Sequence, residues 1–208
     1  MNANHLTENR IIELLKKNSS QSFEDVPNGS YRRAAVLVPL LLIENEWHLL
    51  FTRRTEEVQY HKGQVSFPGG AAEPGDRSIE WTALREACEE IGVRPRYVRV
   101  LGRLEPVTTI SQYLVTPVVG RVKWPLATNP APNEVSRIFT IPLTWLAESS
   151  NWEERPYELP DGNVHRVIFF REYDGELLWG ISAKITLMLL RSLGLLSKKL
   201  NSGLLAAV

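Results

Sequence analysis

Residues 69–93 limit the fold of this chain more narrowly than any other segment. They begin with Gly69 and Gly70, pass through a short polar loop, and continue as a periodic stretch from about Ser78 to Ile91. Gly92 follows directly, and a glycine at this position commonly ends an α-helix. The segment therefore predicts a glycine-containing loop that leads into a helix of defined length.

Apolar and acidic side chains separate on this helix when its residues are spaced at about 100°. The apolar ones gather on one side, which we expect to face the core: Trp81, Leu84, Ala87, Cys88 and Ile91. Glu86, Glu89 and Glu90 stand at positions i, i+3 and i+4 and fall together on the opposite side. Three carboxylates are thus predicted to share one small patch.

A patch of three carboxylates is unfavourable by itself, because like charges on a helix surface repel by about 0.2–0.5 kcal/mol per pair. A bound divalent cation would reverse this repulsion, and oxygen-rich clusters suit Mg²⁺ or Mn²⁺. The simpler interpretation is a solvated acidic helix face. The residues around the helix bear on the choice between the two.

The spacing around the glutamates extends the pattern. After Gly69 and Gly70 come five residues, Asp76, eight residues, and then a core of the form R-E-x-x-E-E-x-G that begins at Arg85. This run resembles the signature of the Nudix hydrolases. The usual signature has glutamate where this chain has Asp76, and one residue fewer before Arg85. Both departures leave the metal-binding core of the motif unchanged.

The resemblance implies a role for each charged residue of the helix. Glu86 and Glu90 would bind the metal ions directly, Glu89 would complete the set or act through water, and Arg85 would steady the carboxylates by ion pairing. The general base stays open. Glu134, in a later loop, is one candidate, and Glu86, Glu89 or a metal-bound hydroxide are the others.

Gly69 and Gly70 would let the backbone pass close to a metal ion or a phosphate, where a side chain would obstruct it. The alternative is a tight turn before the helix, with no contact to a ligand. We favour the first interpretation, which makes both glycines candidate substrate-binding residues.

The stretch before the helix narrows the range of expected substrates. From Leu49 to Gly70 it resembles the additional motif of the coenzyme A pyrophosphatase branch, which also shares the aspartate and the longer spacing seen around Asp76. Two departures remain, Gln59 where the branch has arginine and Thr55 where serine is common. The resemblance implies hydrolysis of coenzyme A or an acyl-CoA to 4′-phosphopantetheine, or its acyl form, and adenosine 3′,5′-bisphosphate.

Coenzyme A carries a pyrophosphate and a 3′-phosphate, so its site should offer guanidinium and ammonium groups to these oxygens. Arg54 matches the arginine of the branch motif, and Arg53 and Lys62 lie near it in sequence. His61 and Gln64 are weaker candidates in the same loop, since a histidine in a polar loop is more often solvated. For Arg53 and Lys62, an ordinary surface position is an equal alternative.

Other functions stay open at this point. A Nudix enzyme with the same chemistry would instead act on ADP-ribose, dinucleotides or nucleoside triphosphates. A non-catalytic Nudix module that binds a nucleotide is an alternative of another class, against which the intact glutamates argue. A third interpretation treats Glu86 to Glu90 as a solubilising face on an interaction domain.

The resemblance implies an α/β fold, namely the Nudix α/β/α sandwich with a mixed central sheet. Helices are expected at His5–Lys17, Pro142–Glu148 and Ile181–Leu195, and strands at Ala34–Ile43, Trp47–Arg53, Tyr97–Leu104, Tyr113–Val122, Val164–Tyr173 and Glu176–Trp179. Residues 1–208 are expected to form a single Nudix domain, with residues 1–30 as an N-terminal appendage.

The composition limits the partners. The 24 basic and 24 acidic residues balance, which disfavours nucleic acid and anionic membranes as partners. The resemblance implies a small-molecule nucleotide as the partner, and a homodimer stays open. The single cysteine, Cys88, excludes an intramolecular disulfide, and residues 1–10 lack the layout of a signal peptide. The longest apolar run, Ala34–Ile43, is too short to cross a membrane. We therefore expect a cytoplasmic protein.

Overall fold

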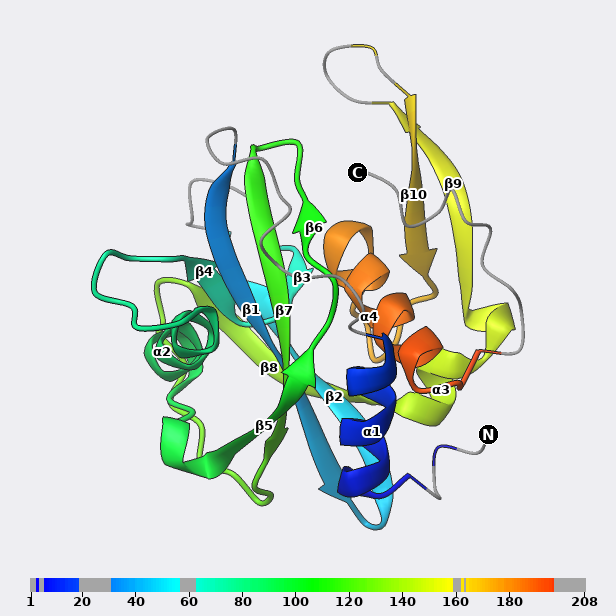
Figure 1. The fold of residues 1–208 in the computed structure, drawn as a ribbon. Helices are drawn as coiled ribbons and strands as arrows, with labels where there is room; N and C mark the ends of the chain where they lie inside the picture. Colours follow the sequence, from blue (N-terminus) through cyan, green and yellow to red (C-terminus); the bar gives the residue numbers. More distant parts are fainter. Residues whose placement is uncertain are drawn as a thin grey trace.

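The computed structural model of the chain (Figure 1) describes residue 3 and residues 6–18, 31–56, 63–158, 162 and 164–196. The helices are α1 (Glu8–Asn18), α2 (Ile79–Ile91), α3 (Leu143–Ala147) and α4 (Gly180–Ser192), with the short 3₁₀ helices η2 (Pro95–Tyr97) and η3 (Ser149–Asn151). The strands are β1 (Arg32–Ile43), β2 (Glu46–Arg54), β3 (Val65–Ser66), β4 (Gly69–Ala71), β5 (Val98–Arg103), β6 (Val107–Thr108), β7 (Tyr113–Val122), β8 (Val135–Pro142), β9 (Trp152–Glu158) and β10 (Val164–Phe170). Gln59, His61 and Lys62 lie outside the described residues.

Eight strands form one mixed sheet with the main order β3-β2-β1-β7-β5. Off this path, β4 pairs with β1, β6 with β7 and β8 with β2. β1 and β7 run parallel, and the other pairs of this sheet are antiparallel. β9 and β10 form a separate two-stranded ribbon. The expected α/β architecture with a mixed central sheet is confirmed.

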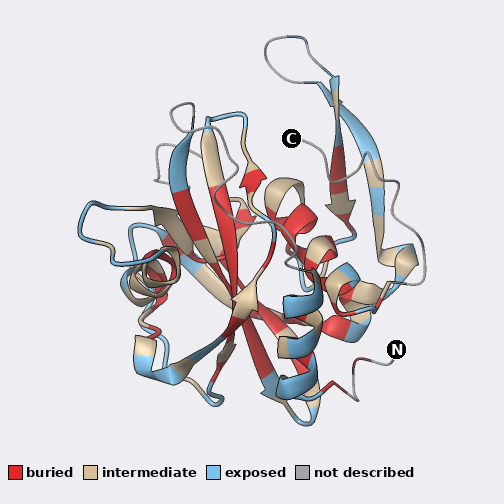
Figure 2. Cartoon of the chain, in the orientation of Figure 1, coloured by how far each residue is buried: buried red, intermediate tan, exposed pale blue. Residues whose placement is uncertain are grey.

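Helices cover both faces of the sheet (Figure 1). α2 packs on one face, in an apolar core that it shares with β1 and β7. α1, α3 and α4 pack on the other face, in a larger core that also receives β10. Buried residues concentrate where the central strands cross between these layers (Figure 2). β1 lies in the middle of the sheet and is covered on both faces, which explains its nearly continuous apolar run.

The first expected helix is present as α1 and packs against the sheet. Ile11 and Leu15 are fully buried in the larger core. The carbonyl of Leu6 accepts a hydrogen bond of 2.8 Å from the indole nitrogen of Trp47. Gly102 of β5 lies so close to α1 that a Cβ atom there would stand 3.1 Å from Leu15. Side chains of α1 therefore belong to the same core as the sheet.

α2 begins and ends as its sequence predicts. The hydroxyl of Ser78 accepts a hydrogen bond of 3.2 Å from the backbone N–H of Trp81, which caps the first turn. Gly92 takes the left-handed conformation at φ 74°, and its N–H bonds back to the last turn. The helix is therefore bounded by local chemistry at both ends.

The orientation of α2 differs from the expected one. Ala83, Ala87 and Ile91 face the core, but Glu90 is buried with them, and Trp81 is only partly covered, beneath the guanidinium of Arg77. The prediction that all three glutamates lie opposite the core is wrong for Glu90. The small side chains of Ala83 and Ala87 allow α2 to approach β1 closely. The buried side of α2 is therefore rotated about the helix axis by about 90° from the expected side, toward the glutamates.

Two parts of the C-terminal half also differ from expectation. The predicted strand at Glu176–Trp179 is wrong, because this segment makes only isolated bridges, Tyr173 with Glu176 and Phe169 with Trp179. The strands β8 and β9 were not expected. β9 is mostly polar and exposed, so its sequence lacks the apolar alternation of a buried strand.

No helix in the described segments combines the length and the apolarity that crossing a membrane requires.

Candidate active site

The glycine pair lies in strand β4, and the alternative of a tight turn is wrong. A Cβ atom on Gly69 would collide with the carbonyl oxygen of Ala35 in β1, and a Cβ atom on Gly70 would lie 2.6 Å from the carboxylate of Glu86. The N–H of Gly69 donates a hydrogen bond of 3.1 Å to Glu90 Oε2. Both glycines thus permit a close approach, to β1 in one case and to a glutamate of α2 in the other.

Arg85 lies at the centre of a network that joins α2 to the preceding loop. Its Nε and Nη2 donate to the two carboxylate oxygens of Asp76, each at 3.0 Å. Its Nη1 donates to Glu86 at 2.9 Å and to Glu89 at 3.1 Å, and Nη2 also reaches the carbonyl of Ala71. This bidentate pairing holds the pKa of Asp76 well below its usual range. Asp76 therefore stays ionised and fixes Arg85 beside the glutamates.

Glu90 is the most enclosed of the three glutamates, with a side chain 7% exposed. Arg54 of β2 pairs with it, with Nη1 at 3.8 Å from Oε1. Burial raises the pKa of Glu90 to about 7, an effect that the Gly69 N–H and Arg54 partly offset and that the charges of Glu134 and Glu86 increase. Within the part of the chain that the structure describes, the buried Nε of Arg54 has no hydrogen-bond partner. This corner of the site therefore contains an under-compensated carboxylate beside an incompletely satisfied arginine.

Glu134 approaches Glu90 through the loop before β8. The backbone N–H of Ala131 donates to the carbonyl of Glu90 at 2.8 Å, and the carbonyl of Glu134 accepts from the N–H of Thr55 at 3.0 Å. The hydroxyl of Thr55 also donates to the carbonyl of Asn133. Thr55, noted in the sequence only as a departure from a motif, thus ties the end of β2 to the loop that contains Glu134. The Glu134 residue itself is exposed.

Arg53 and Arg54 contact different acidic residues, and the pairing of β2 with β8 shifts register between them. Arg53 lies with Glu176 at 3.7 Å and with Glu56 at 3.8 Å, away from the glutamates of α2. Gln64 pairs through its carbonyl with the N–H of Arg54. The structure thus brings Arg54 to the glutamates and places Arg53 elsewhere. Lys62 and His61 cannot be placed, since they lie outside the described residues.

The donor chemistry of the site fits a hard divalent cation, although the three glutamates are not gathered. Among the described residues, no three acidic, histidine or cysteine side chains converge closely enough to form a cation site. Arg85 engages Glu86 and Glu89, while Glu90 faces Gly69 and Arg54. Burial raises the pKa of Glu86 as well as that of Glu90, and the positive charges of Arg85 and Arg54 offset this effect only in part. A bound cation would supply that charge, and oxygen donors suit Mg²⁺ or Mn²⁺.

Comparison with known proteins relates these residues to a family. The model of the NUDIX domain matches residues 31–160. A protein of Photorhabdus laumondii described as an uncharacterized Nudix hydrolase, NudL, is 42% identical over 154 residues, which cover 74% of this chain and 81% of the relative. The NudL protein of Yersinia pestis strain Pestoides F is 40% identical over 158 residues, covering 76% and 78% of the two chains.

Solved structures show more distant likenesses. A Nudix hydrolase of M. smegmatis, RenU, aligns with a TM-score of 0.48 at 20% identity and covers 62% of this chain and 81% of its own. The binary complex of a C. elegans Ap4A hydrolase aligns with a TM-score of 0.47 at 18% identity, covering 53% and 80%. At these values the likenesses have no bearing on the substrate of this chain.

Proposed function

This chain belongs to the Nudix hydrolases, enzymes that hydrolyse a pyrophosphate linkage in a nucleotide derivative, and we propose that its substrate is coenzyme A or an acyl-CoA. The proposed products are 4′-phosphopantetheine, or its acyl form, and adenosine 3′,5′-bisphosphate. A cytoplasmic location is proposed with it.

The contact between Arg54 and Glu90 carries the proposal. The run from Leu49 to Gly70 resembles the motif of the coenzyme A branch, and its described residues contribute to β2, β3 and the start of β4. Its arginine, Arg54, lies 3.8 Å from the buried glutamate of α2. A motif arginine beside a catalytic glutamate is suitably placed to bind an oxygen of the scissile pyrophosphate. The Nε of Arg54, which has no partner among the described residues, is a further donor for it.

The acidic residues of α2 are the proposed metal ligands. Glu86 and Glu90 would hold Mg²⁺ or Mn²⁺ directly, with Glu89 completing the set or acting through water. When bound, such cations activate water and neutralise the charge of the leaving phosphate. Binding requires ionised carboxylates, and Arg85 helps to keep Glu86 ionised by donating to it at 2.9 Å.

The remaining residues would position the substrate and accept a proton. Gly69 and Gly70 allow β4 to pass against Glu90 and Glu86 without side chains in between. Glu134 would act as general base from the loop beside Glu90, with Glu86, Glu89 and a metal-bound hydroxide as alternatives. Arg53 and Lys62 are proposed to bind phosphates away from the scissile bond.

A side-by-side assay tests the substrate. Purified protein with Mg²⁺ or Mn²⁺ would be incubated with coenzyme A, ADP-ribose, NADH and a dinucleoside polyphosphate, and the products separated by chromatography. Preferential conversion of coenzyme A to 4′-phosphopantetheine and adenosine 3′,5′-bisphosphate is the expected result. Preferential cleavage of another compound would refute the substrate and keep the pyrophosphate chemistry.

A further inference from the structure

An arginine that the proposed mechanism does not use lies near the start of β1. Arg33 is exposed, and its guanidinium makes no hydrogen bond or ion pair with the described residues. Its backbone carbonyl accepts a hydrogen bond of 2.9 Å from the N–H of Ala72, directly after β4. The register of β1 against β4 therefore determines how far Arg33 lies from the candidate active site.

The side chain of Arg33 belongs to the face of the sheet that α2 covers. Side chains alternate between the two faces along a strand, and the pairing of β1 with β7 is regular over Arg32–Leu40. Ala35 and Leu37 lie in the core that α2 shares with β1. Val36, between them, packs in the opposite core. Arg33 stands two residues before Ala35 and thus shares the face of α2.

Glu86 meets this face two residues along the strand from Arg33. Ala35 pairs with Gly70 of β4, and residues directly opposite each other in a sheet point to the same side. A Cβ atom on Gly70 would lie 2.6 Å from the Glu86 carboxylate. Two residues of a strand span about 7 Å, which is comparable to the length of an extended arginine side chain. Arg33 can therefore reach a ligand that is bound at Glu86.

Arg33 and Arg54 stand at the two ends of the pair of buried glutamates. Arg54 lies 3.8 Å from Glu90, whose carboxylate also accepts the N–H of Gly69. Along β4, Gly69 thus meets Glu90 and Gly70 meets Glu86, and the position of Arg33 continues this line beyond Glu86. Each phosphate of a pyrophosphate is negatively charged. One arginine beside Glu90 would leave the second phosphate without a cation from the protein.

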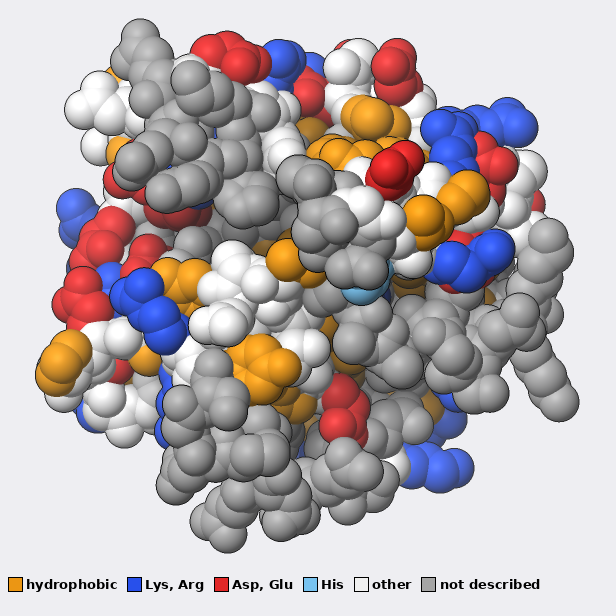
Figure 3. Space-filling view, turned by 90° about the horizontal axis from the view of Figure 1, so that it is seen from above, with side chains coloured by type: hydrophobic (Ala, Val, Ile, Leu, Met, Phe, Trp, Pro, Cys, Tyr) orange, Lys and Arg blue, Asp and Glu red, His pale blue; other side chains and the backbone are white. Residues whose placement is uncertain are grey.

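Arg85, the other guanidinium near Glu86, is already engaged within the protein. All three of its nitrogens donate hydrogen bonds, to the side chains of Asp76, Glu86 and Glu89 and to the carbonyl of Ala71. Acidic and basic side chains lie next to one another on the α2 side of the molecule when it is seen from above (Figure 3). A donor for the second phosphate therefore has to come from another residue on this side.

Arg32 differs from Arg33 although it is the adjacent residue. It pairs with Tyr113 of β7, and its guanidinium lies 5.0 Å from the centroid of that ring. The alternation of the strand places it on the face opposite α2. Arg32 thus has the same charge and a similar depth in the strand, but not the same access to Glu86.

We propose that Arg33 is a substrate-binding residue that holds the phosphate of the pyrophosphate lying farther from Arg54. The assignment rests on the proposed cation site at Glu86 and Glu90, and it does not depend on coenzyme A as the substrate. A guanidinium donates parallel hydrogen bonds to a phosphate, so Arg33 would fix the orientation of this group as well as compensate its charge.

Binding of imidodiphosphate, a pyrophosphate analogue that resists hydrolysis, tests the assignment without turnover. Calorimetric titrations with Mg²⁺ would compare the wild type, Arg33→Gln and Arg33→Lys. Arg33→Gln should bind at least about 10-fold more weakly, as the loss of a charged hydrogen bond implies. Arg33→Lys should lie between the two, because lysine retains the charge and loses the bidentate geometry. Equal affinities of the wild type and Arg33→Gln would overturn the proposal.

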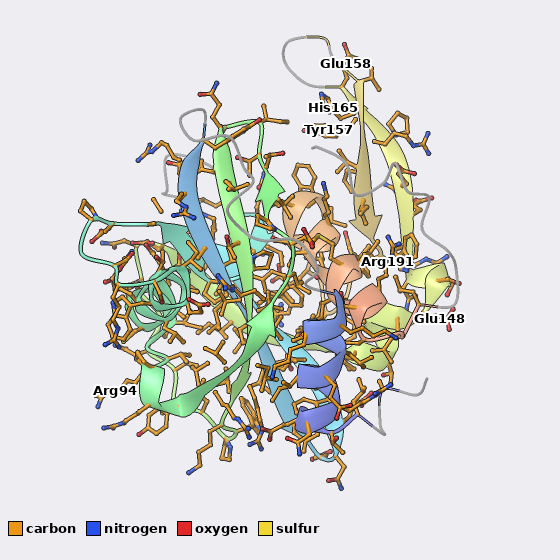
Figure 4. The ribbon with its side chains drawn as sticks, in the orientation of Figure 1. Arg94, Glu148, Tyr157, Glu158, His165 and Arg191 are labelled. Carbon is orange, nitrogen blue, oxygen red and sulfur yellow. The ribbon has the colours of Figure 1, made fainter. Side chains whose placement is uncertain are left out.

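Two variants remove the same charge elsewhere. Arg32→Gln changes the adjacent residue on the other face, and Arg94→Gln changes an exposed arginine far from the start of β1 (Figure 4). Both should bind imidodiphosphate within about 2-fold of the wild type, as surface substitutions usually do little. A loss in either variant as large as that in Arg33→Gln would show a general effect of net charge and would overturn the assignment.

Steady-state kinetics separate this assignment from the proposed substrate. On the nucleotide that the side-by-side assay selects, Arg33→Gln should lower kcat/KM at least about 10-fold. If that nucleotide is ADP-ribose and the loss is seen, the coenzyme A proposal fails and the role of Arg33 stands. If coenzyme A is cleaved by Arg33→Gln with an unchanged kcat/KM, the substrate stands and the role of Arg33 fails.

Discussion

Glu90 is a buried carboxylate whose negative charge is only partly compensated by its neighbours. Its side chain lies beneath β4, receives one backbone N–H, and faces a guanidinium at 3.8 Å. A surface glutamate would need none of these contacts. The buried and hydrogen-bonded position of Glu90 suits the proposed role as a metal ligand. A carboxylate that is held rigidly and partly shielded from water favours a cation over water as its partner.

Replacing Glu90 by glutamine tests this role. Glu90→Gln retains the shape of the side chain and removes its charge, so turnover should fall at least about 100-fold while folding is preserved. Steady-state kinetics and a thermal melt would be measured together. Glu80→Gln is the control on the same helix, since Glu80 pairs with Arg103. A Glu90→Gln enzyme that keeps most of its activity would exclude Glu90 as a metal ligand.

The stability of the metal-free protein should depend on pH through Glu90. Its folded pKa is about 7, against an ordinary value of 4.5, so the folded state binds this proton more tightly than the unfolded state does. The associated stability is fully present below pH 4.5 and is lost as pH rises through 7, by an amount on the order of 3 kcal/mol.

Urea denaturation in EDTA between pH 4.5 and pH 8 measures this loss. The Glu90→Gln protein should show a flatter profile over this window, and added Mg²⁺ should stabilise the wild type most at the alkaline end. Parallel profiles for the two proteins would show that another group is responsible.

At the scale of elements, α2 is held by the loop before it. Asp76 binds Arg85 through both oxygens and accepts further hydrogen bonds from the Thr82 hydroxyl and the Glu73 N–H. Asp76→Asn should lower the free energy of unfolding by about 1–3 kcal/mol, because a charged pairing is lost. Asp76→Glu, which restores the usual residue of the signature, should recover part of this loss.

Urea denaturation measures the free energy of unfolding of the two Asp76 variants. Glu73→Gln is the control, because Glu73 is exposed and lies 3.9 Å from Arg85. An unchanged stability in Asp76→Asn would show that the loop does not hold the helix.

Strand β4 and helix α2 meet at Gly70 with no room for a side chain. In Gly70→Ala, the new Cβ atom would stand 2.6 Å from the Glu86 carboxylate. We expect turnover to drop more than about 10-fold, with a stability loss of about 1–3 kcal/mol from overpacking. Gly75→Ala, where a Cβ atom meets nothing within 4 Å, is the matched control. Full activity in Gly70→Ala would mean that Glu86 is not confined by β4.

At the scale of the whole molecule, we propose that residues 1–208 fold as one cooperative unit that includes α1. Ile11 is fully buried in the core shared with the sheet, so Ile11→Ala should cost about 2–5 kcal/mol. Chemical denaturation followed by tryptophan fluorescence and by circular dichroism measures this cost. Glu13→Ala, on the exposed side of the same helix, is the control. Two separate transitions would indicate that α1 unfolds independently.

Local patterns predicted much of the architecture. The hairpin of β1 and β2, the helix α2 with its Ser78 cap and Gly92 end, and the long helix α4 all follow from signals within one segment. β9 escaped prediction because its residues are polar and exposed and lack the apolar alternation of a buried strand, although its partner β10 follows directly in the sequence.

The sequence alone determined the family, the spacing of the glutamates and the need for small residues at Gly69 and Gly70, because these depend on helical period and backbone space. Tertiary structure decided the burial of Glu90, since Ala83 and Ala87 let α2 settle on β1, a contact made by distant residues. It also separated Arg53 from Arg54. Burial and pairing are set by what packs across from a side chain, and periodicity alone does not contain that information.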